Sequence, residues 1–153
     1  MKTLIVYDST YGNTEKVARA IGGAINGDIK ALRVGELKPG DMESLDLLVV
    51  GSPTQGGRAT QPMQAFLTQI PASVLKGKNV AAFDTRMTTK LVGIFGYAAG
   101  RIADSLKTKG GSLVLTEEGF FVTGAKGPLK EGELERAAKW GRELVQGMIV
   151  AKN

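Results

Sequence analysis

The chain has 153 residues, of which 42% are hydrophobic and 23% are charged, a composition that suits one globular domain of common size. It contains no cysteine and no histidine, which excludes disulfides, thiolate metal sites, iron–sulfur clusters and thiol nucleophiles, so any redox chemistry must come from a bound organic cofactor. Lysine and arginine number 20 against 15 aspartates and glutamates, but no basic platform with interleaved aromatic residues accompanies this excess, and we expect no nucleic-acid partner.

The first predicted element is a strand at residues 4–7, and the sequence turns polar at Asp8. This apolar stretch is too short for a signal peptide, and no apolar run in the sequence reaches the length of a membrane span. We therefore expect a cytoplasmic protein without membrane insertion, folded as a single domain over residues 1–153.

Strands and helices are predicted to alternate along the rest of the chain. Continuous apolar runs are typical of parallel strands buried on both faces, and they occur at residues 4–7, 47–50, 79–84 and 112–115, while residues 29–34 alternate like an edge strand. Helical periodicity occurs at residues 17–25, 62–69, 97–109 and 134–148. The stripe predicted for the last helix consists of Leu134, Ala138, Gly141, Leu144, Val145 and Met148.

This alternation requires right-handed crossovers and predicts a doubly wound α/β fold with three layers. In such sheets ligands bind beyond the carboxyl ends of the strands, where the winding direction reverses. The loops that follow the first, third and fourth predicted strands are therefore the places to look for a site.

The first of these loops combines hydroxyl residues with a glycine and leads directly into a helix. Its residues are Ser9, Thr10, Tyr11, Gly12, Asn13 and Thr14. Unpaired backbone amides converge at a helix N-terminus, which carries about half a positive charge, so the loop can cradle a phosphate without a lysine. The alternative is that a single hydroxyl caps the helix, which contributes about 1 kcal/mol.

The segment Ser9–Thr14 resembles the phosphate loop of the flavodoxin family, which reads hydroxyl residue, any residue, threonine, glycine, any residue, threonine. Tyr11 stands where that family usually has its second threonine. The resemblance covers the whole chain, because residues 120–134 are similar to a motif of uncharacterised flavodoxin-like proteins. It implies a five-stranded parallel sheet in the order 2-1-3-4-5 and FMN as the cofactor.

The second loop resembles the flavodoxin loop that wraps the isoalloxazine ring, and the resemblance assigns it to the cofactor site. The residues concerned are Pro53, Thr54, Gln55, Gly56, Gly57 and Arg58. Gly56 and Gly57 permit positive φ and allow the backbone to approach a planar ligand closely. A simple tight turn at these two glycines is the open alternative.

The third loop departs from the family pattern, because no aromatic residue follows the fourth strand directly. The resemblance places Asp84, Thr85 and Arg86 at the pyrimidine edge of the ring, and Tyr97 is the first candidate for stacking on it. Packing of Tyr97 at the start of the fourth helix is the alternative. Arg58, Arg86 and Lys90 would make the second reduction potential less negative and favour a redox partner protein with an acidic docking surface.

The combined pattern predicts an FMN-binding electron carrier without catalytic side chains or a metal site. A receiver domain is excluded because Gly51 and Ser52 end the third strand where such a domain needs an aspartate. P-loop hydrolases and dinucleotide-binding folds lack support because their glycine motifs do not follow the first strand. A small FMN-dependent quinone-type reductase and a degenerate interaction module without flavin stay open, and the oligomeric state is not predicted.

Overall fold

The apolar runs of the sequence form parallel strands in the computed structural model, which describes residues 1–88 and 96–152. The strands are β1 (Lys2–Tyr7), β2 (Asp28–Arg33), β3 (Leu47–Pro53), β4 (Asn79–Met87), β5 (Ser112–Leu113) and β6 (Glu118–Val122). They form one sheet in the order β2-β1-β3-β4-β5, with β6 also paired to β4, and every pairing is parallel. The predicted fold class and the order 2-1-3-4-5 are thus confirmed.

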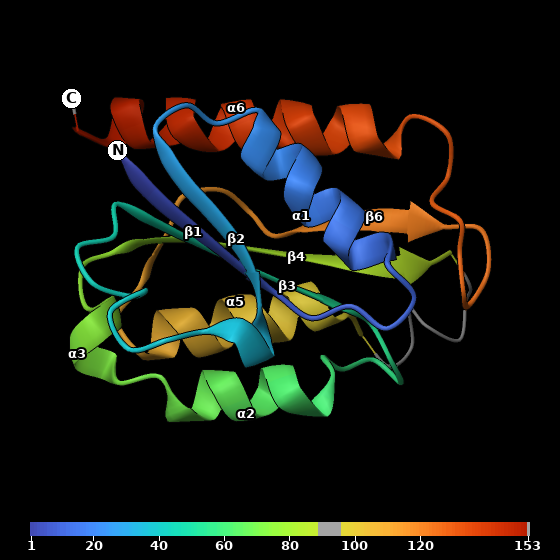
Figure 1. The fold of residues 1–153 in the computed structure, drawn as a ribbon, viewed down its shortest axis with the longest axis horizontal. Helices are drawn as coiled ribbons and strands as arrows, with labels where there is room; N and C mark the ends of the chain where they lie inside the picture. The colour runs from blue at the N-terminus through green and yellow to red at the C-terminus, as the bar shows by residue number, and fades with distance from the viewer. Residues whose placement is uncertain (89–95, 153) are drawn as a thin grey trace.

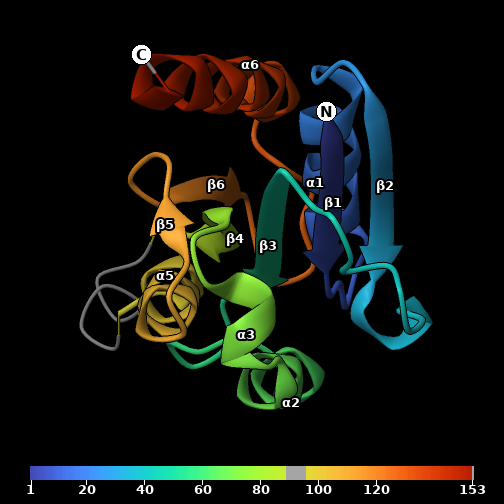
Figure 2. The ribbon, with the colours of Figure 1, turned by 90° about the vertical axis from the view of Figure 1, so that its left-hand side faces the viewer.

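Helices cover both faces of this sheet and produce three layers, as Figure 1 shows. The helices are α1 (Asn13–Gly23), α2 (Gln61–Gln69), α3 (Ala72–Leu75), α5 (Ala98–Thr108) and α6 (Glu133–Lys152), with a short 3-10 turn at Val34–Glu36. Helices α1 and α6 pack together on one face, and α2, α3 and α5 lie on the other (Figure 2). Within the described chain, no helix combines the length and the apolar character needed to cross a membrane.

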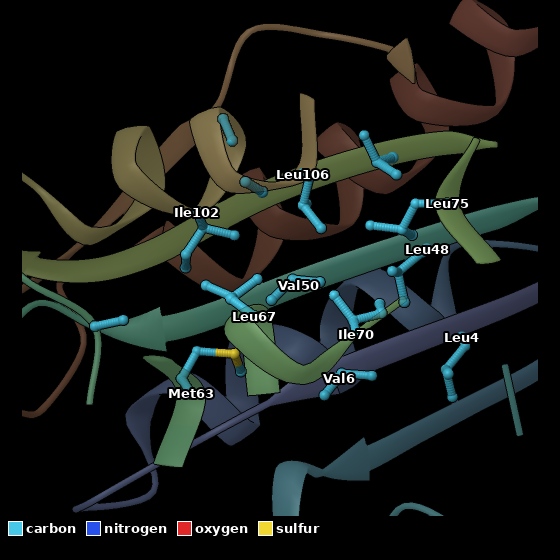
Figure 3. Close-up of a cluster of buried hydrophobic side chains, with 14 of the residues drawn as sticks. Leu4, Val6, Leu48, Val50, Met63, Leu67, Ile70, Leu75, Ile102 and Leu106 are labelled. Carbon is cyan, nitrogen blue, oxygen red and sulfur yellow. The ribbon is translucent and has the colours of Figure 1, made fainter. Parts of the chain in front are cut away.

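Two hydrophobic clusters hold the helices to the sheet, because alternate residues of each strand point to opposite faces. Leu4 and Val6 of β1 join the cluster under α2 and α5, whereas Ile5 and Tyr7 join the cluster under α1 and α6. Figure 3 shows the first cluster, whose labelled members are Leu4, Val6, Leu48, Val50, Met63, Leu67, Ile70, Leu75, Ile102 and Leu106. Each fully buried aliphatic side chain contributes about 1.5 to 3 kcal/mol, so these clusters fix the strand ends rigidly.

The fifth strand differs from its prediction, because the structure divides it into β5 and β6. Leu113 pairs with Val80 and Glu118 pairs with Phe83, so five residue steps on this strand face three steps on β4. The surplus interrupts the pairing after Val114, whose amide still donates to the carbonyl of Val80 (3.0 Å), and the predicted strand at 112–115 ends at Leu113. As a result β6 lies along the carboxyl half of β4.

The predicted apolar stripe of the last helix is partly wrong. Leu134 is 41% exposed, and the helix buries Ala137 and Trp140 in addition to Leu144 and Met148. Leu134 is the second residue of α6, and the core cluster on this face includes Ala137, Trp140, Leu144 and Met148 of the helix but not Leu134.

Candidate cofactor site

A cavity of about 340 Å³ lies beyond the carboxyl ends of β1, β3, β4 and β6, where the strand order predicts a ligand. Its walls come from the loops after β1 and β3, the end of β4, and the end of β6. The lining residues are Thr10, Tyr11, Asn13, Thr14, Pro53, Thr54, Gln55, Thr85, Arg86, Met87, Val122 and Ala125.

The first loop exposes backbone amides at one end of this cavity. Ser9 acts as the local cap, because its hydroxyl oxygen accepts hydrogen bonds from the amides of Gly12 (3.1 Å) and Glu15 (3.4 Å). Gly12 adopts φ 92°, a conformation that turns the chain into α1 and strongly favours glycine. Among the described residues, the amides of Asn13 and Thr14 have no acceptor, so they remain available to an anion.

Buried polar contacts hold the first loop in place. The Asp8 carboxylate accepts hydrogen bonds from the amide of Ser9 and the hydroxyl of Thr60, and it lies 3.7 Å from the guanidinium of Arg33. The Asn13 side chain donates to the carbonyl of Lys126 (3.2 Å) and so connects this loop to the segment after β6. The sequence offered no signal for Asp8 and Thr60, which lie 52 residues apart.

One acidic side chain, Glu15, sits in the first turn of α1 beside the phosphate end. The hydroxyl of Tyr7 donates to it (3.1 Å), which lowers the pKa of the Glu15 carboxyl below its usual value. Burial of Tyr7, together with the same contact, raises the pKa of the Tyr7 hydroxyl. Arg19 and Arg33 lie 3.4 and 3.7 Å from Glu15 and offset its negative charge near an incoming anion.

The second loop makes a tight turn and sends only its first residues into the cavity. Gln55 and Arg58 exchange two backbone hydrogen bonds across Gly56 and Gly57, which have φ values of 58° and 78°. These two glycines and Arg58 are not among the described residues that line the cavity, and their contact with the cofactor stays a prediction. Arg58 instead lines a separate cavity between α2 and α5.

Thr54 and Gln55 connect this second loop to its neighbours. The Thr54 amide donates to the carbonyl of Thr85 (2.9 Å), and the Gln55 amide group donates to the Thr10 hydroxyl (2.9 Å). Thr85 in turn shares a 2.8 Å hydroxyl contact with Thr14. The three loops therefore form one hydrogen-bonded rim.

The end of β4 carries a buried ion pair. Arg86 donates from Nε and Nη2 to the two carboxylate oxygens of Asp84, at 2.7 and 2.9 Å. Asp84 is fully buried and therefore lies behind the cavity wall, whereas Thr85 and Arg86 line it. The guanidinium of Arg86 stacks on the Tyr97 ring, with its central carbon 3.6 Å from the ring centroid.

Tyr97 is not among the described residues that line the cavity, and its ring-stacking role stays a prediction. It is the N-cap residue of α5 and supports Arg86 from below the cavity wall, which is the packing alternative stated for it. Lys90, which the sequence placed near the ring, lies outside the described residues.

Three lining residues were missed from the sequence, namely Met87, Val122 and Ala125. They supply apolar surface, and Met87 pairs in register with Val122 where β6 follows β4. Their signal was the apolar segment 120–122, which could be read as the end of a strand but not as a partner of the end of β4. Tyr11, by contrast, is 54% exposed at the rim, with the Lys126 ammonium 6.0 Å from its ring.

Comparison with known proteins identifies the family. The family model for the flavodoxin domain matches residues 4–110. The chain belongs to the flavodoxin domain family. A flavodoxin from Megasphaera elsdenii is 30% identical over 110 residues, which cover 69% of this chain and 73% of that protein. Family members bind FMN and transfer electrons to redox partners.

Other similar proteins include an enzyme, matched over little more than half of its length, and two flavodoxins of known structure that share the fold. The NAD(P)H dehydrogenase (quinone) of Azorhizobium caulinodans is 32% identical over 114 residues, and the match covers 57% of each protein. The structure of a flavodoxin from the domain Archaea has a TM-score of 0.81 at 24% identity, covering 97% of this chain and 99% of that one. Oxidised flavodoxin 2 from Bacillus cereus has a TM-score of 0.79 at 23% identity, covering 95% and 99%.

The cavity of this flavodoxin domain suits the two ends of FMN. The unpaired amides and the hydroxyls of Thr10 and Thr14 suit a phosphate at the start of α1. The apolar surfaces of Pro53, Met87 and Val122 suit a flat aromatic ring at the other end. The residues present are therefore compatible with the cofactor of the family.

Proposed function

We propose that this chain is a single-domain electron carrier that holds one FMN in the cavity and passes one or two electrons between redox partners. The observation that carries the proposal is the joint presence of an uncharged anion cradle and an apolar wall in one cavity at the switch point of a flavodoxin sheet. When bound, FMN accepts and releases electrons at its ring, and the protein needs no acid, base or metal for that step.

The side chains of the chain have binding and shielding roles in this proposal. The amides of Asn13 and Thr14 hold the phosphate, and the backbone of Thr54 and Thr85 fixes the cavity wall. Met87 and Val122 exclude water from one side of the ring. Tyr11 remains exposed at the rim, where a partner can contact it together with Lys126.

We propose that the partner presents an acidic surface to this rim. Lys126 and Lys130 are exposed on the segment after β6, and Lys130 lies near the end of β4 through its contact with Thr88 (3.2 Å). Opposite charges steer association between proteins, and this steering weakens as salt is added. A cytoplasmic location is compatible with this role and remains part of the proposal.

The absorption spectrum of the purified protein tests the cofactor. A yellow solution, or a colourless protein that binds added FMN, is the expected result, and FMN should bind more tightly than riboflavin because the first loop holds the phosphate. A protein that gains no flavin signal with added FMN would contradict the proposal. The alternative of a flavodoxin-like interaction module without flavin would then be favoured.

A small quinone-type reductase is the second candidate, and the similarity to NAD(P)H dehydrogenases (quinone) over 57% of the chain favours it. Steady-state oxidation of NADH or NADPH with a soluble quinone separates the two. Rapid turnover without a second protein would support the reductase, whereas reduction that requires a partner reductase would support the carrier.

A further inference from the structure

The Asp84–Arg86 pair is held more firmly than its place at a strand end requires. Asp84 is fully buried and receives three hydrogen bonds, two from Arg86 and one from the amide of Ala99 (2.9 Å). Arg86 lies between the Tyr97 ring and the backbone of Gly119, where an added Cβ would come within 2.2 Å of its Nε. The guanidinium is thus fixed on three sides by residues from β4, α5 and β6.

Stability alone does not explain this arrangement. Moving two charges out of water costs about as much as their mutual attraction returns, and apolar residues of similar volume are often equally stable or better. The neighbouring side of β4 already packs apolar side chains such as Phe83. A buried ion pair at the wall of a ligand cavity therefore calls for a role towards the ligand.

One edge of the guanidinium remains available for that role. Arg86 uses Nε and Nη2 for Asp84, and among the described residues Nη1 has no acceptor. Of the described residues that line the cavity, Arg86 alone carries a formal charge. The cavity thus contains one positive charge, compensated from behind by Asp84.

We propose that the Asp84–Arg86 pair sets the charge preference of the flavin site, a proposal that rests on FMN binding as proposed above. A flavin ring that has taken up two electrons and one proton carries one negative charge, and Arg86 Nη1 stabilises that charge by hydrogen bonding and Coulomb attraction. Asp84 is a positioning residue that holds Arg86 in place and limits its positive field. The pair then raises the second reduction potential only moderately, and its two members act in opposite directions.

The proposal is testable because removing Arg86 and removing the charge of Asp84 should shift the reduction potential in opposite directions. In Arg86→Gln the ratio of the affinities for fully reduced and oxidised FMN should fall about tenfold, which corresponds to about 30 mV for the two-electron couple. In Asp84→Asn, which keeps the shape of the side chain, the ratio should rise. Arg86→Lys should recover most of the lost ratio because it restores the charge, and the double variant Asp84→Asn with Arg86→Gln should return towards the wild-type value.

The measurements are potentiometric titration of each holoprotein and the dissociation constant of oxidised FMN. Lys30→Gln is the matched control, because Lys30 lies on the edge strand β2 and its positive charge pairs with Asp41 at the surface. This variant should leave the ratio of the two FMN affinities unchanged. Shifts of the same sign in Arg86→Gln and Asp84→Asn, or no shift in either, would overturn the proposal.

A second measurement needs no variant. In the wild-type holoprotein, the fully reduced ring should keep its negative charge to a lower pH than free FMN does. The second reduction potential should therefore stay independent of pH down to that lower pH. Protonation at the pH of free FMN, or above it, would overturn the charge-setting role. A wild-type protein that binds no FMN would instead refute the proposed function itself, so the two failures are distinguishable.

Discussion

The phosphate end and the ring end of the cavity are built from different parts of the polypeptide. At the phosphate end, backbone amides of consecutive residues converge at the start of α1, and the conformation of Gly12 aims them. At the ring end, the ion pair of Asp84 and Arg86 on β4 lies between the Tyr97 ring at the start of α5 and the backbone of Gly119 on β6. The first end depends on local conformation and the second on long-range packing, so they should fail in different ways.

The largest expected effect is at the phosphate end. In Gly12→Val a branched residue would have to adopt φ 92°, and we expect FMN binding to weaken by about 2 to 3 kcal/mol as the amides turn away. Riboflavin binding should change little, because it has no phosphate. Fluorescence titration with both ligands measures the difference, with Gly23→Ala as control, since Gly23 has ordinary φ and no atom near its missing Cβ. Equal losses for both ligands would contradict a phosphate role for this loop.

At the ring end, Gly119→Ala should act through packing. The new methyl group would lie 2.2 Å from Nε of Arg86, so the guanidinium must move, and we expect a loss of about 2 kcal/mol in the free energy of unfolding. Denaturant unfolding of the apoprotein measures this. Gly100→Ala is the control, because its Cβ would meet only Glu117 Oε1 at an ordinary 3.6 Å. A Gly119→Ala protein as stable as wild type would show that Arg86 is not held tightly.

The contact between the two ends can be measured through Thr14 and Thr85, whose hydroxyl oxygens lie 2.8 Å apart in a buried position. Thr14→Val and Thr85→Val should each lower the free energy of unfolding by about 1 kcal/mol, because each leaves one hydroxyl unpaired. The double variant should lose less than the sum of the two. Additive losses in this double-mutant cycle would mean that the ends are independent. Thr68→Val, which changes an exposed helix residue, should have little effect.

An effect of similar size concerns the support of β6 by α6, through Glu133. Burial alone would raise the pKa of this carboxyl, but hydrogen bonds from Arg136 and from the Phe121 amide outweigh burial and lower it. Because its folded pKa lies below the unfolded value, Glu133 stabilises the protein above the unfolded pKa of 4.5, and this contribution disappears as the pH falls through the folded pKa.

Glu133→Gln should therefore lower the free energy of unfolding by about 1 kcal/mol at neutral pH and flatten the acid limb of the stability curve. Thermal melts between neutral and acid pH measure both changes. Glu131→Gln, at an exposed position two residues earlier, serves as control. A Glu133 variant whose acid limb still matches wild type would locate the pH dependence elsewhere.

The fold and the phosphate end were accessible from the sequence for the same reason. Apolar runs such as residues 47–50 and the helical period at residues 17–25 are local patterns, and so is the glycine turn at Gly12. The order of the inner strands then follows from burial, because continuous apolar runs such as β1 and β3 must be covered on both faces. The division of the fifth strand could not be predicted in this way, because its two surplus residues are defined only by its pairing with β4.

The ring end could not be predicted in the same way. Arg86 was placed near the ring as a free charge, but its compensation by Asp84 depends on side-chain direction along β4. Its support by Gly119 depends on the pairing of Gly119 with Asp84, 35 residues away in the sequence. Tyr97 was assigned to the ring because an aromatic residue was missing there, and its contact with the guanidinium of Arg86 had no signal in the sequence. Long-range contacts between side chains leave no period or motif in the sequence.

The aromatic cluster behind this end of the sheet provides an internal optical probe. Phe83, Phe120 and Trp140 meet edge to face with ring centroids 6.2 to 6.3 Å apart, and Trp140 is only 4% exposed. Trp140 is the one tryptophan of the chain. Phe83 directly precedes Asp84 in the sequence, and Phe120 directly follows Gly119. Its emission therefore comes from a single rigid position, so energy transfer to a bound flavin would report cofactor occupancy without any label.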